Sequence, residues 1–67
     1  MDTVKIGRKL VELRGDRSQR EVADALKISD SAISAYEQGD RVPRDEVKKR
    51  IAEYYGETVG SIFFDHE

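Results

Sequence analysis

Two short segments of helical periodicity lie back to back between residues 18 and 39, and each has its own start and stop signals. Ser18-Gln-Arg-Glu21 is a capping box, in which the serine accepts from a backbone N–H and the glutamate reaches back, and it predicts a helix over residues 19–26. Ser29 caps a second helix over residues 30–38, which Gly39 ends because glycine readily adopts the left-handed conformation. Helices this short are stable only when they pack against other elements.

Three further segments carry apolar residues at the spacing of one helical face. They are residues 4–14, 44–55 and 59–63. Thr3 and Thr58 are the caps expected for the first and the last of them. No segment alternates with the period of a strand. The sequence therefore predicts an all-α fold, a compact five-helix bundle in a single domain over residues 1–67.

The size and charge of the chain limit its function. It has 67 residues and no cysteine, so helix packing and not disulfides must stabilise a small core. Twelve Lys and Arg against 14 Asp and Glu give a formal net charge of −2, which is not the basic signature of a DNA-binding domain. The charge is uneven, because residues 1–50 carry +2 and residues 51–67 carry −4. A dipolar molecule of this kind can still present a positive face to phosphates.

The residue types that enzymes use are scarce in this chain. It has one histidine, no cysteine, no glycine-rich phosphate loop and no cluster at metal-ligand spacing. We therefore expect no catalytic residue, no metal, no cofactor and no small-molecule ligand. The first residues lack a signal-peptide pattern, and the apolar runs are far shorter than the roughly 20 residues of a membrane span. We expect a soluble, cytoplasmic protein.

The helix over residues 30–38 has the shape of an element that reads DNA. Its first turns carry the polar residues Asp30, Ser31 and Ser34, while Ala32 and Ala35 keep the rest of its surface slim. The major groove of DNA is about 12 Å wide and admits an α-helix. In a helix-turn-helix, the second helix enters this groove and the first crosses the phosphate backbone. Residues 18–38 fit that arrangement.

Together these features resemble the phage-repressor or Cro-like helix-turn-helix regulators, the XRE family. The resembling residues cover nearly the whole chain and are Ile6-Gly-Arg-Lys-Leu-Val-Glu-Leu-Arg14, Ser18-Gln-Arg-Glu-Val-Ala23, Leu26-Lys-Ile-Ser29, Ile33-Ser-Ala-Tyr-Glu37, Gly39, Pro43, Val47, Ile51-Ala52, Thr58-Val59 and Ile62-Phe63. The resemblance implies a lambda-repressor-like DNA-binding domain. It also implies sequence-specific binding of double-stranded DNA by a transcriptional regulator, acting as a dimeric repressor.

The resemblance also implies which residues face the bases: Asp30, Ser31, Ser34 and Ala35. The serines can hydrogen-bond base edges or phosphates, and Ala35 can lie against a thymine methyl group. Asp30 has two interpretations that the sequence leaves open. It either accepts a hydrogen bond from cytosine N4 or is a first-turn acid that the positive end of the helix favours.

Phosphate contacts are implied on both flanks of the reading helix. Gln19 matches the glutamine that opens the first helix of the motif. In the family this residue contacts a phosphate, at a helix start where backbone N–H groups bind anions, and it also braces the reading helix. The cations implied to contact phosphate are Arg17, Arg20, Arg41, Arg44 and Lys48. Taken singly, each of these cations is as well explained as a solvated surface charge.

Two positions bear on the structure of the motif. Glu37 resembles the structural glutamate of the family, which pairs with an arginine of the first helix, and Arg8 and Arg14 are both candidates.

Lys27 lies in the turn where the family usually has glycine. If that position requires positive φ, the lysine costs of order 1 kcal/mol.

The C-terminal segment suggests a subunit contact. Ile62, Phe63 and Phe64 are consecutive, so one helix face cannot bury all three, and we predict that this group makes the contact of a homodimer. A rival interpretation is a protein-interaction module, an anti-repressor or co-regulator on the same fold with weak or no DNA binding. The net negative charge and Asp30 on the reading helix support it.

Overall fold

The computed structural model describes residues 2–64 and contains only helices over this range. The elements are α1 (Thr3–Arg14), α2 (Gln19–Leu26), α3 (Asp30–Gln38), α4 (Asp45–Tyr55) and the π-helix η1 (Gly60–Phe64). The predicted all-helical class is confirmed. None of the helices between residues 2 and 64 combines the length and the apolar character that crossing a membrane requires.

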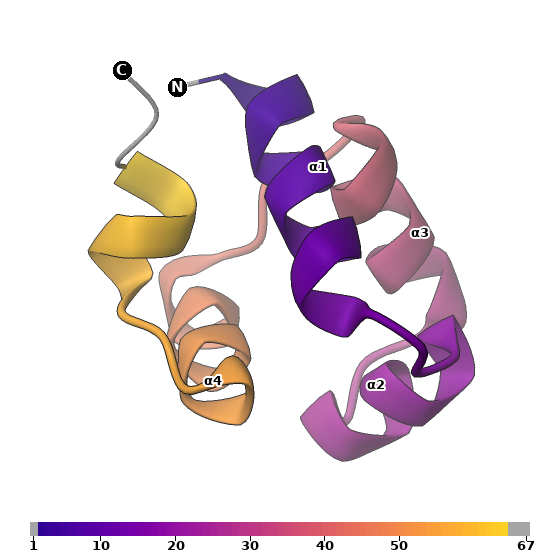
Figure 1. The fold of residues 1–67 in the computed structure, drawn as a ribbon. Coiled ribbons are helices and arrows are strands. Elements are labelled where there is room, and N and C mark those ends of the chain that lie inside the picture. Colours follow the sequence, from indigo (N-terminus) through magenta and orange to yellow (C-terminus); the bar gives the residue numbers. More distant parts are fainter. Residues whose placement is uncertain (1, 65–67) are drawn as a thin grey trace.

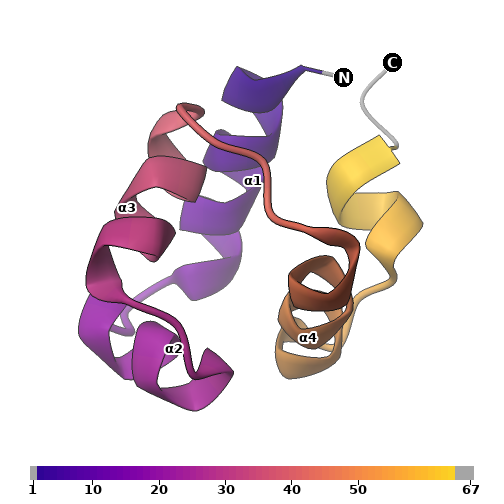
Figure 2. The ribbon, with the colours of Figure 1, turned by 180° about the vertical axis from the view of Figure 1, so that it is seen from behind.

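The helices form two groups that meet along α1. α1 and α3 run side by side, and α2 packs against the lower end of α3 (Figure 1). α4 and η1 lie on the other side of α1, as the view from behind also shows (Figure 2). α2 contacts α4 and α1 contacts η1, so the second group closes the core from the side away from α3.

One apolar core receives side chains from all five elements. Its buried members are Ile6, Leu10, Val22, Ala23, Leu26, Ala32, Ile33, Tyr36, Val47, Ile51, Ala52, Ile62 and Phe63. Leu13, Ile28, Tyr54, Tyr55 and Val59 pack against it while partly exposed. Each helix is too short to be stable alone, so this shared burial holds the elements together.

The helix starts follow the capping chemistry of the sequence, with one correction. Ser18 and Ser29 accept hydrogen bonds from the backbone N–H groups of Glu21 and Ala32, at 3.0 and 3.1 Å, as predicted. The prediction that Thr3 caps α1 is wrong, because the Asp2 carboxylate accepts from the Lys5 N–H at 3.1 Å. Aspartate and threonine are both good N-cap residues. Because Asp2 and Thr3 are adjacent, the sequence placed the start of α1 one residue too late.

The C-terminal helix departs from the predicted α-helix over residues 59–63. Thr58 caps it as expected, since its hydroxyl oxygen accepts from the Ser61 N–H at 3.0 Å. The segment then winds as a π-helix, which turns through a smaller angle per residue than an α-helix. Consecutive Ile62 and Phe63 therefore both enter the core and are 0% exposed, whereas Phe64 is 59% exposed. The predicted dimer contact is wrong for Ile62 and Phe63, which have no surface to offer.

Gly7 allows α1 and α3 to approach closely. It is buried in the middle of α1, and a Cβ atom at this position would overlap the backbone carbonyl oxygen of Glu37 on α3. No other residue type fits at this crossing without moving one helix away from the other.

The turn between α2 and α3 contains a strained residue. Lys27 has φ 60° and ψ 43°, and it is the one non-glycine residue with positive φ in the described part of the chain. This left-handed conformation turns the chain so that the following N–H, that of Ile28, donates to the carbonyl oxygen of Ala23 at 3.0 Å and closes the end of α2. Position 27 therefore does require positive φ. The steric cost predicted from the sequence for this case is borne by a lysine.

We predict that Lys27→Gly stabilises the fold by about 0.5–1 kcal/mol, because glycine relieves more strain here than it adds to the entropy of the unfolded chain. Urea unfolding measures the change. Lys27→Ala is the control, since it removes the charge but keeps a Cβ in the left-handed region. An equal gain in both variants would assign the effect to charge and contradict the strain.

Candidate nucleic-acid interface

The carboxylate of Glu37, on α3, joins three elements of the fold. Its Oε2 accepts from Arg14 Nε at 2.7 Å, and its Oε1 accepts from Arg14 Nη2 at 3.1 Å and from Gln19 Nε2 at 2.9 Å. The Glu37 side chain is only 6% exposed. The end of α1 and the start of α2 are thereby both fastened to α3.

Arg14 is the arginine that pairs with Glu37, which settles the choice that the sequence left open between Arg8 and Arg14. The hydrogen bond to Glu37 raises the pKa of the Arg14 guanidinium above its ordinary value. Nη1 of the same guanidinium donates to the backbone carbonyl oxygen of Arg17 at 2.7 Å. Arg14 therefore also holds the loop that leads into α2.

Gln19 occupies the first position of α2, directly after the Ser18 cap. Its amide nitrogen donates to Glu37, so the side chain braces α3 in the way the family resemblance implies. The remainder of the side chain is half-buried and lines the surface next to α3.

An open groove of about 450 Å³ runs along the outer face of α3. It is lined by Gln19, Asp30, Ser31, Ser34, Ala35, Gln38 and Asp40. All four side chains predicted to face bases thus lie in one depression, together with Gln19. Its walls are short side chains, which leaves room for the edge of another molecule.

Two residues of this groove, Gln38 and Asp40, were missed in the sequence. Gln38 follows Ser34 by one helical turn, and its Nε2 donates to the Ser34 hydroxyl oxygen at 2.8 Å, so the helical spacing was a usable signal. Asp40 lies beyond the helix, where periodicity gives no information. Its N–H donates to the carbonyl oxygen of Ala35 at 2.9 Å, and this bond folds the chain back so that Asp40 reaches the groove.

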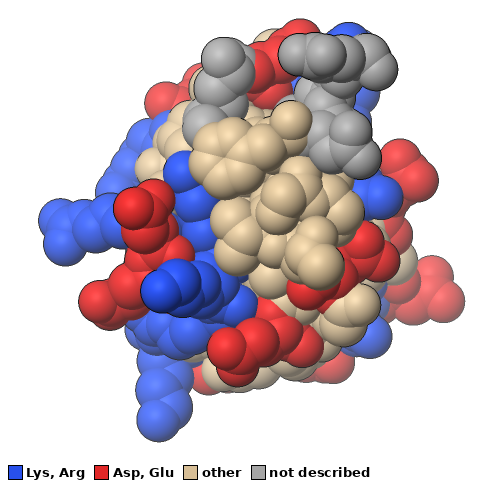
Figure 3. Space-filling view, turned by 90° about the vertical axis from the view of Figure 1, so that its left-hand side faces the viewer, with Lys and Arg blue, Asp and Glu red and all other residues tan. Residues whose placement is uncertain are grey.

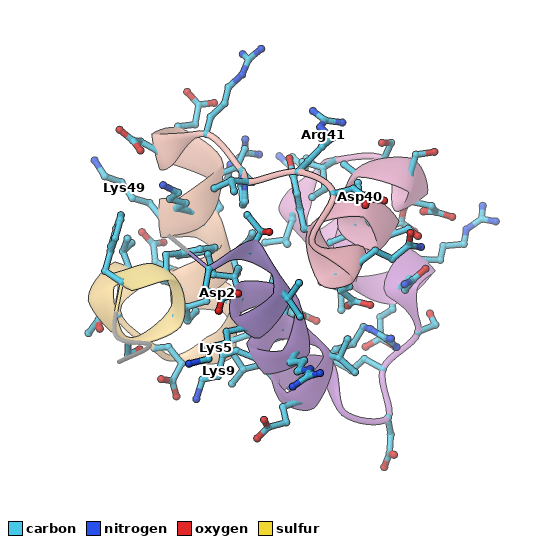
Figure 4. The ribbon with its side chains drawn as sticks, turned by 90° about the horizontal axis from the view of Figure 1, so that it is seen from above. Asp2, Lys5, Lys9, Asp40, Arg41 and Lys49 are labelled. Atoms are coloured by element: carbon cyan, nitrogen blue, oxygen red, sulfur yellow. The ribbon has the colours of Figure 1, made fainter. Side chains whose placement is uncertain are left out.

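Three of the predicted phosphate-contacting arginines are exposed, one on α2 and two between α3 and α4. Arg20 lies on α2 and Arg44 directly precedes α4, where it makes no side-chain capping bond. Arg41 extends outward from the loop after α3, close to Asp40 (Figure 4). Its guanidinium lies 5.8 Å from the centroid of the Tyr36 ring.

Arg17 is exposed but is partly engaged within the protein. Its guanidinium lies over the rings of Tyr54 and Tyr55, 5.3 and 5.6 Å from their centroids. The two tyrosines meet edge to face, and burial raises the pKa of Tyr55 to about 12. This aromatic contact ties the loop before α2 to the end of α4.

The prediction that Lys48 contacts phosphate is wrong. The Lys48 side chain is only 8% exposed, and its Nζ lies 3.6 Å from an Asp45 carboxylate oxygen. The same atom lies 4.9 and 5.7 Å from the ring centroids of Phe64 and Phe63. The cation therefore lies against η1, where the aromatic rings attract it, and has little surface left for a phosphate.

The comparisons with known proteins agree with this geometry. Residues 5–60 match the family described as "Helix-turn-helix domain". The chain belongs to the helix-turn-helix family. It is 31% identical over 61 residues to the cryptic phage CTXphi transcriptional repressor RstR of Vibrio cholerae, an alignment that covers 88% of this chain and 55% of that protein. The chain thus spans about half the length of the curated relative it matches, and no solved structure matches it.

The parts of the helix-turn-helix can now be assigned to the chain. α2 is the first helix, residues 27–29 form the turn, and α3 is the second helix, which carries the groove. The resemblance to phage-repressor regulators that the sequence suggested is confirmed. Between residues 2 and 64, no three acidic or histidine side chains gather in the manner of a metal site.

Proposed function

We propose that this helix-turn-helix binds double-stranded DNA in a sequence-specific manner and acts as a transcriptional repressor, with α3 in the major groove. The observation that carries the proposal is the groove on α3, which gathers the polar reading positions into one exposed surface. The similarity to a phage repressor supports the regulatory role. In the motif, the start of the second helix reaches the bases, and in this chain Asp30 and Ser31 occupy that place.

The phosphate contacts follow from the same placement. α2 begins at Gln19, and the N-terminus of a helix favours an anion. Arg20 on α2, and Arg41 and Arg44 after α3, supply positive charge on the two sides of α3. A duplex seated on α3 would bring its two backbones toward these two sets of cations.

We predict a steep salt dependence of duplex binding, with log K falling by about 0.9 per unit of log salt for each phosphate contact. Arg44→Ala should weaken all duplexes alike and reduce this slope by about one contact. Fluorescence anisotropy over a salt series measures both effects. Arg8→Ala, the loss of an exposed arginine of α1, is the matched control and should leave the slope unchanged.

A second candidate function is favoured by the acidic members of the groove. Asp30 and Asp40 both line it, and the chain carries a formal net charge of −2. A module that binds another regulator would use such a surface without gripping phosphate. The salt series distinguishes the two functions. Salt-dependent binding of the duplex supports the DNA-binding function, and its absence supports the protein-interaction function.

We further propose that the protein acts as a homodimer through the surface around Phe64. A hollow of about 340 Å³ is lined by Asp45, Lys48, Lys49, Val59 and Phe64. Figure 3 shows an uncharged area on the side of the molecule formed by α4 and η1, with charged side chains around it. A two-fold axis through such a surface uses the same patch on both copies and so brings Phe64 against its counterpart. A dimer presents two reading helices to half-sites about one helical turn apart.

We predict that Phe64→Ser abolishes the dimer, because it removes the largest apolar contribution to this surface without touching the core. Sedimentation should show a folded monomer, whose thermal stability is lower only by what the dimer contact contributes, and operator affinity should fall about tenfold or more. Val11→Ser, at a valine of α1 that is 45% exposed, is the control and should remain dimeric. A wild-type monomer at the concentrations that saturate DNA would contradict the dimer.

A further inference from the structure

Asp30 lies in the first turn of α3, where the positive end of the helix favours a carboxylate. The cap of α3 is supplied by Ser29, whose hydroxyl oxygen accepts from the Ala32 N–H at 3.1 Å, so Asp30 is not needed there. None of the ion pairs or side-chain hydrogen bonds found between residues 2 and 64 engages Asp30. Its side chain is exposed and lines the groove on α3. The carboxylate is therefore available to a bound molecule.

The rest of the groove combines hydroxyl groups, which can donate or accept, with a second carboxylate. Gln38 Nε2 donates to the Ser34 hydroxyl oxygen at 2.8 Å, and Asp40 supplies the second carboxylate. An ionised carboxylate can only accept, so Asp30 needs a partner that donates a hydrogen bond. In the major groove only cytosine N4 and adenine N6 donate, while guanine and thymine present acceptors.

The chemistry of the base edges favours cytosine over adenine. Adenine places its N7 acceptor beside the N6 amino group, where it repels a second carboxylate oxygen, whereas cytosine presents the N4 amino group without a neighbouring acceptor on the same base. We propose that Asp30 is a specificity-determining residue that accepts a hydrogen bond from the N4 amino group of a cytosine. This proposal rests on the proposed DNA-binding function of the same groove.

The small neighbours of Asp30 make this contact geometrically reasonable. Aspartate has a short side chain, so the start of α3 must lie close to the base edges for its carboxylate to reach them. Ser31, Ser34 and Ala35 are short enough to permit that approach. The carboxylate also repels phosphates, so it weakens binding to every duplex that lacks the cytosine. Specificity is the difference in affinity between duplexes with and without this cytosine.

The test is selection of duplexes from a random pool by the full chain and by Asp30→Asn. The wild-type protein should enrich cytosine roughly tenfold at one position of each half-site. Asp30→Asn should lose this enrichment, favour adenine there because asparagine pairs with its N6 and N7, and bind unselected duplex several-fold more tightly. Asp30→Glu keeps the carboxylate and should keep cytosine.

Asp24→Asn is the matched control, because it makes the same change of charge at an exposed residue of α2 outside the groove. It should leave the base preference unchanged. A cytosine preference that persists in Asp30→Asn would overturn the role of Asp30 while the DNA-binding function stands. Loss of the preference in Asp24→Asn as well would also overturn it. If the wild-type chain binds no duplex, the proposed function itself fails. Circular dichroism checks that each variant is folded.

Discussion

The orientation of the reading helix depends on the contacts of Glu37. Its carboxylate, nearly removed from solvent, is satisfied by Arg14 of α1 and Gln19 of α2. A charge in such a position is costly without partners, so its pairs must form whenever the fold forms. The backbone of Glu37 is held as well, because Gly7 allows α1 to approach its carbonyl group. Since α3 is fixed on this inner side, its opposite face, with Ser31 and Ser34, is turned outward as an open groove.

The features that local chemistry determines could be predicted from the sequence, and the features that long-range packing determines could not. The bounds of α2 and α3 followed from their serine caps and from Gly39. The partner of Glu37 was ambiguous, because Arg8 and Arg14 are both on α1 and only the crossing of α1 with α3 selects between them. Lys48 and Phe63 were misplaced for a related reason. The π winding of η1 cannot be read from periodicity, and the rings of Phe63 and Phe64 that lie near Lys48 belong to this segment.

The uneven placement of charge in the fold is compatible with the proposed DNA binding by a chain of net negative charge. The arginines of the α2 and α3 side are exposed, whereas the cation of Lys48 is withdrawn under η1. The α4 and η1 side is left with Phe64 and balanced charges, which suits contact with a second copy. The proposed reading and pairing surfaces therefore lie on different groups of helices, and each can be altered without the other. Asp30 and Asp40 depart from this cationic pattern, and the proposed specificity for cytosine accounts for Asp30.

A double-mutant cycle between Arg14 and Glu37 tests most directly whether this network sets the reading helix. The exposed pair Arg50 and Glu46, with Nη2 and Oε1 3.4 Å apart, is the control within the same chain. We expect a coupling of about 1.5–3 kcal/mol in the free energy of unfolding for Arg14 and Glu37, against under about 0.5 kcal/mol for the control. Glu37→Gln should also weaken duplex binding in conditions where the variant remains folded. Equal couplings for the two pairs, with duplex affinity unchanged in Glu37→Gln, would contradict the account.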